Sequence, residues 1–145
     1  MVSEDNTTKT NENAELSHLG QGGTQPSRTL ETFPNRNPDR DYLVELTTDE
    51  FTCVCPMTGQ PDFADIAIRY VPDQKIVESK SLKLYLWSFR NKGIFHEHVS
   101  NRILDDLVEV LDPRWCQVDA HFSIRGGIAI RIKAEHGTFP PHLST

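Results

Sequence analysis

The sequence predicts an α+β domain whose elements follow one another in the order ββααββ. Three observations support this fold class: strand-like residues over 42–73, two amphipathic helical segments within 79–112, and a strand–turn–strand pattern over 115–135. A four-stranded antiparallel sheet with both helices on one face satisfies this order. The open sheet face and the two sheet edges would still need cover, so we expect association between copies through sheet edges.

Composition places the chain among ordinary globular proteins. It has 145 residues, of which 37% are hydrophobic and 25% charged, enough for one domain with a real core. Residues 1–28 are polar and rich in Gly, Asn and Thr, which predicts a mobile tail ahead of a single domain over residues 29–145. The net charge of -6 argues against direct nucleic-acid binding.

Targeting features are also informative. No apolar run approaches the roughly 20 residues that a membrane span needs. Glu4 and Asp5 stand where a signal peptide would be basic, so we expect a cytoplasmic protein without membrane contact, in which thiols stay reduced.

The first half of the domain is predicted as a loop and two strands. Residues 29–41 form a proline-punctuated approach loop. Residues 42–55 are rich in β-branched and aromatic side chains and predict one strand or two short ones. In residues 64–73 one face carries Ile66, Ile68 and Tyr70, and the strand is broken by Val71-Pro72-Asp73.

Two helices are predicted next. At about 100° per residue, residues 79–91 gather one apolar stripe of Leu82, Tyr85, Leu86 and Phe89. The opposite side carries Lys80, Lys83, Trp87 and Arg90. Residues 95–112 present a broad apolar face and end at Asp112-Pro113.

The last two strands are predicted as a hairpin. Residues 115–124 alternate, with Cys116, Val118, Ala120, Phe122 and Ile124 on one face and Trp115, Gln117, Asp119, His121 and Ser123 on the other. Arg125-Gly126-Gly127 makes a tight turn into residues 128–135, where Ile128, Ile130 and Ile132 share a face.

Cys53 and Cys55 could have several roles. A disulfide does not suit a reducing compartment. A metal site lacks support, because the C-x-C pair has no Cys-x-x-Cys or Cys-x-x-His partner. His96 and His98 are two positions apart on a helix, where two side chains do not face each other and seldom bind one ion. Plain core packing stays open for both cysteines, since free Cys is among the most buried residue types.

The remaining hypothesis is that Cys55 is a nucleophile. Cys55 is the last residue before Pro56, where a strand end can face a cleft. Asp62 follows in a turn stiffened by Pro56, Gly59 and Pro61, which limits the movement of its carboxylate. A thiol with a pKa of about 8.5 needs a base or a positive neighbour to react at neutral pH. Asp62 could exchange that proton.

Charged residues near the two helices suggest ligand contacts. Glu78 precedes the first helix, a position suited to capping as well as to ligand binding. His96 and Glu97 project onto the apolar side of the second helix, where a carboxylate is costly unless it is paired or used. The cations around Trp87 are typical of a solvated face, but they would also suit a phosphate-bearing ligand with a flat ring.

These residues resemble a known family when they are taken together. The blocks CPMTGQPDFA, ESKSLKLYLWSFRN, FHEH and RGG, in this order and spacing, are similar to the NADPH-dependent 7-cyano-7-deazaguanine reductases, the nitrile reductases of queuosine biosynthesis. The similarity runs from about Leu30 to Glu135 and matches the short single-domain form. It implies a tunnelling fold, in which ββααββ subunits join their sheets into a barrel, commonly a pentamer stacked into a decamer. It implies no metal.

The resemblance also implies a reaction. Cys55 matches the thiolate that attacks the nitrile carbon of 7-cyano-7-deazaguanine to give a covalent thioimidate. Asp62 matches the acid that gives protons to the nitrogen. Hydrides from two successive NADPH molecules then produce the aminomethyl group. Cys53 is not a motif position, and the N-terminal tail lies outside the match.

Ligand contacts follow in the same way. Glu78 matches a residue that binds the deazaguanine ring, His96 and Glu97 match the same pocket, and Val77 and Ser79 flank Glu78. We assign Lys80, Lys83 and Arg125 to NADPH phosphates, from the cation stripe and the Gly-rich turn.

Two other functions stay in view. GTP cyclohydrolase I shares the implied fold but needs a catalytic zinc, and this chain lacks its Cys-x-x-His arrangement. A non-catalytic oligomeric module that binds a purine or pterin, with a structural Cys55, is the second alternative.

Overall fold

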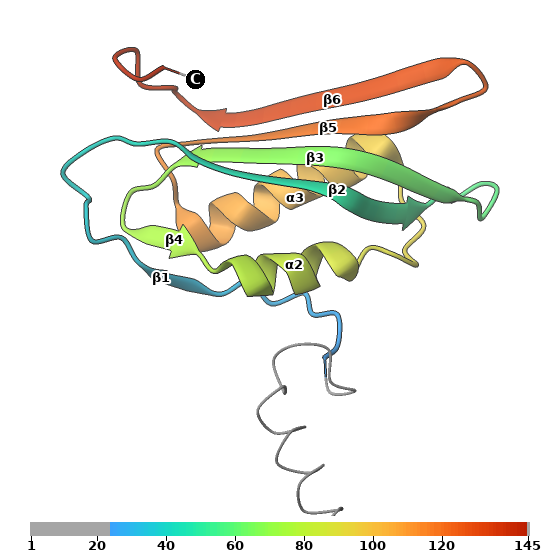
Figure 1. The fold of residues 1–145 in the computed structure, drawn as a ribbon, viewed down its shortest axis with the longest axis horizontal. Helices are drawn as coiled ribbons and strands as arrows, with labels where there is room; N and C mark the ends of the chain where they lie inside the picture. The colour runs from blue at the N-terminus through green and yellow to red at the C-terminus, as the bar shows by residue number, and fades with distance from the viewer. Residues whose placement is uncertain (1–23, 145) are drawn as a thin grey trace, which may run out of the picture.

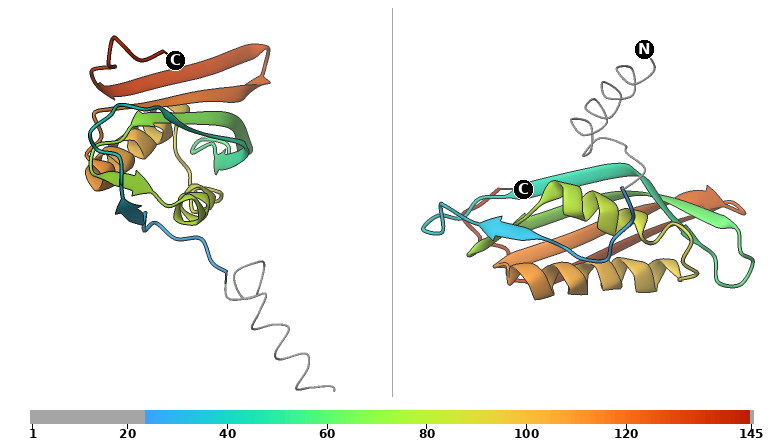
Figure 2. Two further views of the ribbon diagram at one scale, coloured as in Figure 1. Left: turned by 60° about the vertical axis from the view of Figure 1, so that its left-hand side comes forward. Right: turned by 90° about the horizontal axis from the view of Figure 1, so that it is seen from below.

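The computed structural model describes residues 24–144, so all but the last five residues of the mobile tail predicted over residues 1–28 lie outside the described residues. The described chain contains β1 Thr32–Pro34, β2 Val44–Val54, β3 Pro61–Val71, β4 Lys75–Val77, α2 Ser79–Trp87, α3 His96–Leu111, β5 Trp115–Arg125 and β6 Ile128–Gly137. The larger sheet is antiparallel in the order β2-β3-β5-β6. Both helices lie on one face of it (Figures 1 and 2), which confirms the α+β class and the ββααββ order.

The core fills the space between this sheet and the helices. Alternate β3 residues Ile66, Ile68 and Tyr70 are buried, as the alternation of side chains predicts. The core also contains Val118 and Phe122 of β5 together with a list of helix residues: Leu82, Tyr85, Val99, Ile103, Leu107 and Leu111. The two amphipathic periodicities therefore meet at one interface, as expected from the sequence.

A bulge in β2 determines which face its cysteines occupy. The pairing with β3 shifts register between Thr48 and Phe51, so β2 is one irregular strand rather than two. Leu46 faces the core before the shift, and Phe51 and Cys53 face it afterwards. An added residue moves the following side chains to the other face of a strand. The bulge therefore places Cys53 in the core.

Two short strands were not predicted. The expected loop over residues 29–41 contains β1, which pairs with β4 as a separate antiparallel ribbon through Phe33 and Ile76. Strands of three residues carry too little periodicity to be recognised, and the neighbouring prolines favour a loop prediction.

The start of β3 also differs from the prediction. We placed Asp62 in the turn, but β3 begins at Pro61 and Asp62 is paired in register with Cys53. Pro61 is tolerated because it is the first residue of the strand. The turn is therefore shorter, and a strand rather than a loop holds the carboxylate.

The hairpin of β5 and β6 is confirmed around Gly126 and Gly127, whose positive φ values of 58° and 81° suit a tight two-residue turn. Ile124 was expected to share a face with Val118 and Phe122, which are buried, but 68% of it is exposed. On the other face of β5, Trp115, Gln117 and Asp119 are buried. Phe139 packs edge-on against Trp115, and Gln117 and Asp119 are hydrogen-bonded to residues of β6.

Arg114 joins three segments that are distant in the sequence. Its guanidinium donates to the Asp41 carboxylate at 2.8 Å, to the Asp73 carboxylate at 3.0 Å and to the Pro38 carbonyl at 2.5 Å. These contacts tie the loop before β2 and the turn after β3 to the start of β5.

Among the described residues, no helix has the length and apolar character needed to cross a bilayer.

Replacing Arg114 by alanine is expected to lower the free energy of unfolding by about 1–3 kcal/mol, since it removes several charge-assisted hydrogen bonds at once. Arg69 is the control, because its guanidinium meets the exposed Glu45 on the sheet surface, and such a pair contributes about 0–1 kcal/mol. Urea unfolding of both alanine variants measures the difference. Equal losses for the two variants would contradict the role given to Arg114.

Candidate active site

Cys55 stands directly after β2, in a closed turn. Its N–H donates to the carbonyl of Gln60 at 2.8 Å, and its carbonyl accepts from the N–H of Gly59 at 2.9 Å. Gly59 has a φ of +72°, which a side chain would disfavour. The turn between β2 and β3 therefore holds the Cys55 backbone from both sides.

The segment before α3 runs beside the end of β2. Val54 donates its N–H to the carbonyl of Lys92 at 3.0 Å and accepts from the N–H of Ile94 at 3.0 Å, a parallel bridge opposite Gly93. This bridge brings His96, the first residue of α3, to the end of β2 that carries Cys55.

The three cysteines differ in their environments. Hydrogen bonds from the Thr58 side chain, and then from the backbone N–H groups of Thr58 and Met57, lower the pKa of the partly exposed Cys55 thiol. Burial raises the pKa of Cys53 to about 12, and burial raises that of Cys116 to about 12 as well. Core packing thus describes Cys53 and Cys116, and Cys55 is the thiol most readily ionised near neutral pH.

Replacing Thr58 by valine is expected to move the alkylation of Cys55 by iodoacetamide to higher pH, because it removes the hydroxyl that stabilises the thiolate. Thr58→Ser keeps the hydroxyl and should stay close to the unmodified protein. Peptide mass spectrometry across a pH series measures the alkylated fraction of each cysteine. Coinciding profiles for the valine and serine variants would contradict this origin of the lowered pKa.

Asp62 is the buried acid of this end of the fold, with 4% exposure. Its Oδ2 lies 3.1 Å from Nε2 of His96, and its Oδ1 accepts from Arg125 at 2.5 Å. The other arm of the Arg125 guanidinium donates to Oε1 of Gln60. The His96 ring stacks on Phe122 at 4.0 Å between centroids. Residues from β3, α3 and β5 thus converge around Asp62, whose charge also acts on the Cys55 thiol.

This convergence contains residues that sequence reasoning missed. Gln60 and Phe122 were not assigned to the site, and Arg125 was assigned to phosphates rather than to Asp62. No local pattern indicates these contacts, because they depend on how β5 is registered against β3.

A second group of expected ligands lies at the start of α2. The Glu78 carboxylate caps this helix by accepting from the N–H groups of Lys80 at 2.8 Å and Ser81 at 2.7 Å. Val77 is buried and donates its N–H to the Tyr70 hydroxyl at 3.1 Å, whereas Ser79 is exposed. The capping role foreseen for Glu78 is present, and its carboxylate is fixed at a helix N-terminus.

The two groups lie far apart within one chain. Asp62 and Tyr70 both belong to β3, eight residues apart, which corresponds to about 26 Å along a strand. Val77 is hydrogen-bonded to the Tyr70 hydroxyl, so Glu78, the next residue, lies near the end of β3 that is distant from Asp62. In Figure 1 the end of β2 and the start of α3 lie on the right, and β4 leads into α2 on the left. Within one chain, the group around Cys55 and the group around Glu78 therefore do not form a single pocket.

Glu97 also differs from its expected position. We placed it on the apolar side of the second helix, but its side chain is exposed at the first turn of α3. Only His96 of this pair is directed at Asp62.

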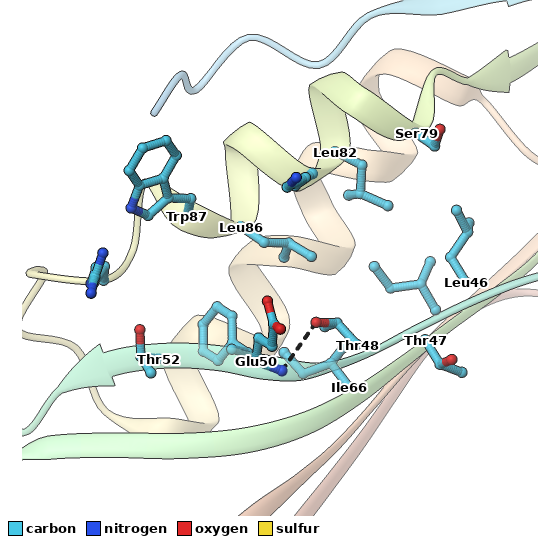
Figure 3. Close-up of a pocket in the computed structure, with 14 residues that line it drawn as sticks. Leu46, Thr47, Thr48, Glu50, Thr52, Ile66, Ser79, Leu82, Leu86 and Trp87 are labelled. Atoms are coloured by element: carbon cyan, nitrogen blue, oxygen red, sulfur yellow. Dashed lines mark hydrogen bonds between the residues drawn. The ribbon is translucent and has the colours of Figure 1, made fainter. Parts of the chain in front are cut away.

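A groove separates α2 from β2 and β3 (Figure 3), with a volume of about 660 Å³. Leu46, Ile66 and Leu82 contribute to its apolar lining. Lys83, Trp87 and Arg90 line it as well, and Ser79 lies at the end where α2 begins. Part of the predicted cation stripe thus borders a concave surface. Within residues 24–144, no three His, Cys, Asp or Glu side chains gather closely enough to hold a metal ion.

Several known proteins are similar to this chain in sequence or in fold. The sequence profile described as "QueF-like protein" matches residues 61–140, more than half of the chain. The chain belongs to the QueF-like protein family. Its members include a 70% identical relative from Syntrophus aciditrophicus (strain SB), named NADPH-dependent 7-cyano-7-deazaguanine reductase, matched over 77% of this chain and 80% of the relative. The resemblance to these reductases is confirmed.

A second sequence relative and a solved structure are also similar to this chain. A relative of the same name from Anaeromyxobacter sp. (strain K) is 62% identical over 81% of this chain and 96% of its own length. The crystal structure of an archaeosine synthase QueF-Like in the apo form matches with a TM-score of 0.63 and 26% identity, over 68% of this chain and 96% of that one.

Proposed function

We propose that this chain reduces the nitrile of 7-cyano-7-deazaguanine to an aminomethyl group with NADPH, in queuosine biosynthesis. Relatives 58–70% identical to it carry the name of this oxidoreductase. The observation that carries the assignment is the partly exposed Cys55 directly after β2, at the same end of the fold as the buried Asp62, which lies 3.1 Å from His96. This pair supplies a nucleophile and a proton carrier, as the reduction of an unreactive nitrile requires.

The proposed chemistry begins at Cys55. Its thiolate adds to the nitrile carbon, forming a C–S bond while the nitrogen takes up a proton by way of Asp62 and His96. NADPH supplies the two hydrides, one from each of two molecules. Between the two hydride transfers the carbon–sulfur bond breaks, so that Cys55 leaves as a thiolate and an imine remains for the second hydride, and Asp62 with His96 delivers further protons to the nitrogen. Covalent attachment thus divides one difficult reduction into easier steps.

The α2 end is proposed to bind the ligands. The fixed Glu78 carboxylate accepts from the N–H groups of the deazaguanine, and Val77 and Ser79 contact the ring beside it. His96 and Glu97, from the other end of the fold, complete the substrate pocket. Lys80 and Lys83 of α2, together with Arg125 from the other end of the fold, bind NADPH phosphates. The position of Lys83 and Trp87 on the groove beside α2 supports this side for the cofactor.

We further propose that the working enzyme is a homo-oligomer, a pentameric ring or a decamer, whose sites form between copies. Two features support this. Cys55 and Glu78 lie at opposite ends of the folded domain, so that a ligand of the size of a purine base cannot touch both residues of the same copy. β2 and β6 are the edge strands of the larger sheet, which another copy can extend. A cytoplasmic location suits a mechanism that requires a reduced Cys55.

The purified protein is expected to oxidise two NADPH for each nitrile consumed, since nitrile to amine is a four-electron change. Activity should persist with a chelator and without added metal. Absorbance at the NADPH band, with the amine quantified by mass spectrometry, gives the ratio. A one-to-one ratio would contradict the proposed reaction, and binding of the nitrile base without NADPH consumption would favour the non-catalytic purine-binding module.

A further inference from the structure

Ser81 is a buried polar residue of α2 to which no role in binding or catalysis was assigned from the sequence. It is 6% exposed, and it lies three residues after Glu78, whose carboxylate is proposed to bind the deazaguanine ring. A buried hydroxyl is costly unless it is hydrogen-bonded. The partners of Ser81 therefore indicate its role.

The hydroxyl of Ser81 completes a strand pair that the start of the helix interrupts. The pairing of β1 with β4 continues for one residue beyond these strands, because the N–H of Glu78 donates to the carbonyl of Glu31 at 2.8 Å. In an antiparallel pair of this type, the N–H of Glu31 would donate in return to the carbonyl of Glu78. That carbonyl instead accepts from the N–H of Leu82 at 3.1 Å, since α2 begins there.

Ser81 bridges the two groups that this arrangement separates. Its Oγ accepts from the N–H of Glu31 at 2.9 Å and donates to the carbonyl of Glu78 at 2.8 Å. The main chain of Ser81 contributes as well, since its N–H donates to Oε2 of Glu78 at 2.7 Å. Ser81 therefore contacts both the backbone and the carboxylate of Glu78, and it ties them to the chain just ahead of β1.

The Glu78 carboxylate keeps acceptor capacity for a ligand. Its Oε1 and Oε2 each accept one backbone N–H from the first turn of α2. A carboxylate oxygen has two lone pairs, so each oxygen can accept one more hydrogen bond. The deazaguanine ring presents a ring N–H and an amino group side by side, which match the two oxygens when the carboxyl plane is held in one orientation. Because Glu78 is only half-buried, this orientation depends on its hydrogen bonds more than on packing.

We propose that Ser81 is a positioning residue for Glu78. Its hydroxyl fixes the Glu78 backbone to the segment ahead of β1, so that the carboxylate meets the deazaguanine ring in one orientation. The proposal rests on the proposed function, because it concerns recognition of that ligand. It predicts a defect in binding the ring rather than in the chemistry at Cys55, which lies at the opposite end of the same domain.

Ser81→Ala is expected to raise the KM for 7-cyano-7-deazaguanine by about 3- to 10-fold, the effect of losing one hydrogen bond. The kcat at a saturating concentration of the base should stay close to that of the unmodified protein, because the Cys55 end of the fold is untouched. Ser81→Thr keeps the hydroxyl and should recover most of the affinity. Steady-state NADPH consumption measures both constants, and urea unfolding shows that each variant is folded.

Ser88→Ala is the matched control. Ser88 follows the last turn of α2, and its hydroxyl donates to the carbonyl of Tyr85, three residues earlier, at 2.5 Å. Ser81 donates to Glu78 over the same spacing, so the two variants lose equivalent hydroxyls from one helix. Ser88→Ala should leave the KM for the base unchanged. Equal increases of KM in the two variants would assign the effect to the stability of α2 and would overturn the proposal.

An analogue without the exocyclic amino group, 7-cyano-7-deazahypoxanthine, tests whether Ser81 acts through Glu78. For the unmodified protein, kcat/KM should fall with this analogue, because a carboxylate oxygen loses its partner. In Ser81→Ala the carboxylate is already misaligned, so the same change in the ligand should cost several-fold less. An equal cost in Ser81→Ala and in the unmodified protein would refute the proposal. An unmodified protein that neither binds nor reduces the nitrile base would instead refute the proposed function, and this role of Ser81 with it.

Discussion

Cys55→Ala is expected to abolish nitrile reduction, whereas Cys53→Ala should retain it. The two residues are chemically alike and two positions apart, but the Cys55 thiol is partly exposed and has a lowered pKa. Cys53 is fully buried, with a pKa raised to about 12 by burial. Without a thiolate at position 55 no side chain can form the thioimidate, so the loss should reach the limit of detection.

Cys53→Ala removes one buried sulfur from the core and should cost about 1 kcal/mol of unfolding free energy. NADPH consumption with the nitrile base, together with urea unfolding, measures both properties in parallel for the two variants. Turnover by Cys55→Ala, or an inactive but folded Cys53→Ala, would reverse the assignment of the nucleophile.

The second large effect is recovery of activity by mixing inactive variants. Cys55→Ala lacks the nucleophile, and Glu78→Gln keeps an oxygen for capping α2 but loses the ring-binding carboxylate. Each alone should be inactive. If a site takes Cys55 from one copy and Glu78 from another, random mixed assemblies contain about one quarter complete sites. Co-refolding the two variants in equal amounts should therefore restore about a quarter of the unmodified activity.

The matched control uses two residues from the same end of the fold. Asp62→Asn cannot supply the proton and should be inactive. Mixing it with Cys55→Ala should restore nothing, because both defects lie in the group that one copy contributes. Sites contained within single chains would give no recovery in either mixture, and that result would contradict the composite site.

Much of the fold could be predicted because its signals are periodic. Ile66, Ile68 and Tyr70 follow the period of a strand, and the helices carry apolar stripes, so their burial does not depend on details of register. The hairpin is marked by Gly126 and Gly127. The β1–β4 ribbon escaped prediction because three residues show no period.

The remaining errors arise from strand register. The bulge between Thr48 and Phe51 and the shift between Phe122 and Arg125 depend on the partner strands, and neither leaves a local signature. The second shift explains why Ile124 is exposed and why Arg125 meets Asp62. Cys55, Asp62 and His96 were assigned to the site from the family resemblance, and this assignment stays a prediction. Their distance from Glu78 is a property of the three-dimensional fold.

The most direct test of covalent nitrile reduction is the mass of the protein after mixing with 7-cyano-7-deazaguanine in the absence of NADPH. We expect an increase by one substrate molecule, mapped to the peptide that contains Cys55, and its disappearance with release of the amine when NADPH is added. An adduct on Cys53, or NADPH-dependent reduction under single-turnover conditions without any adduct on Cys55, would contradict the proposed mechanism.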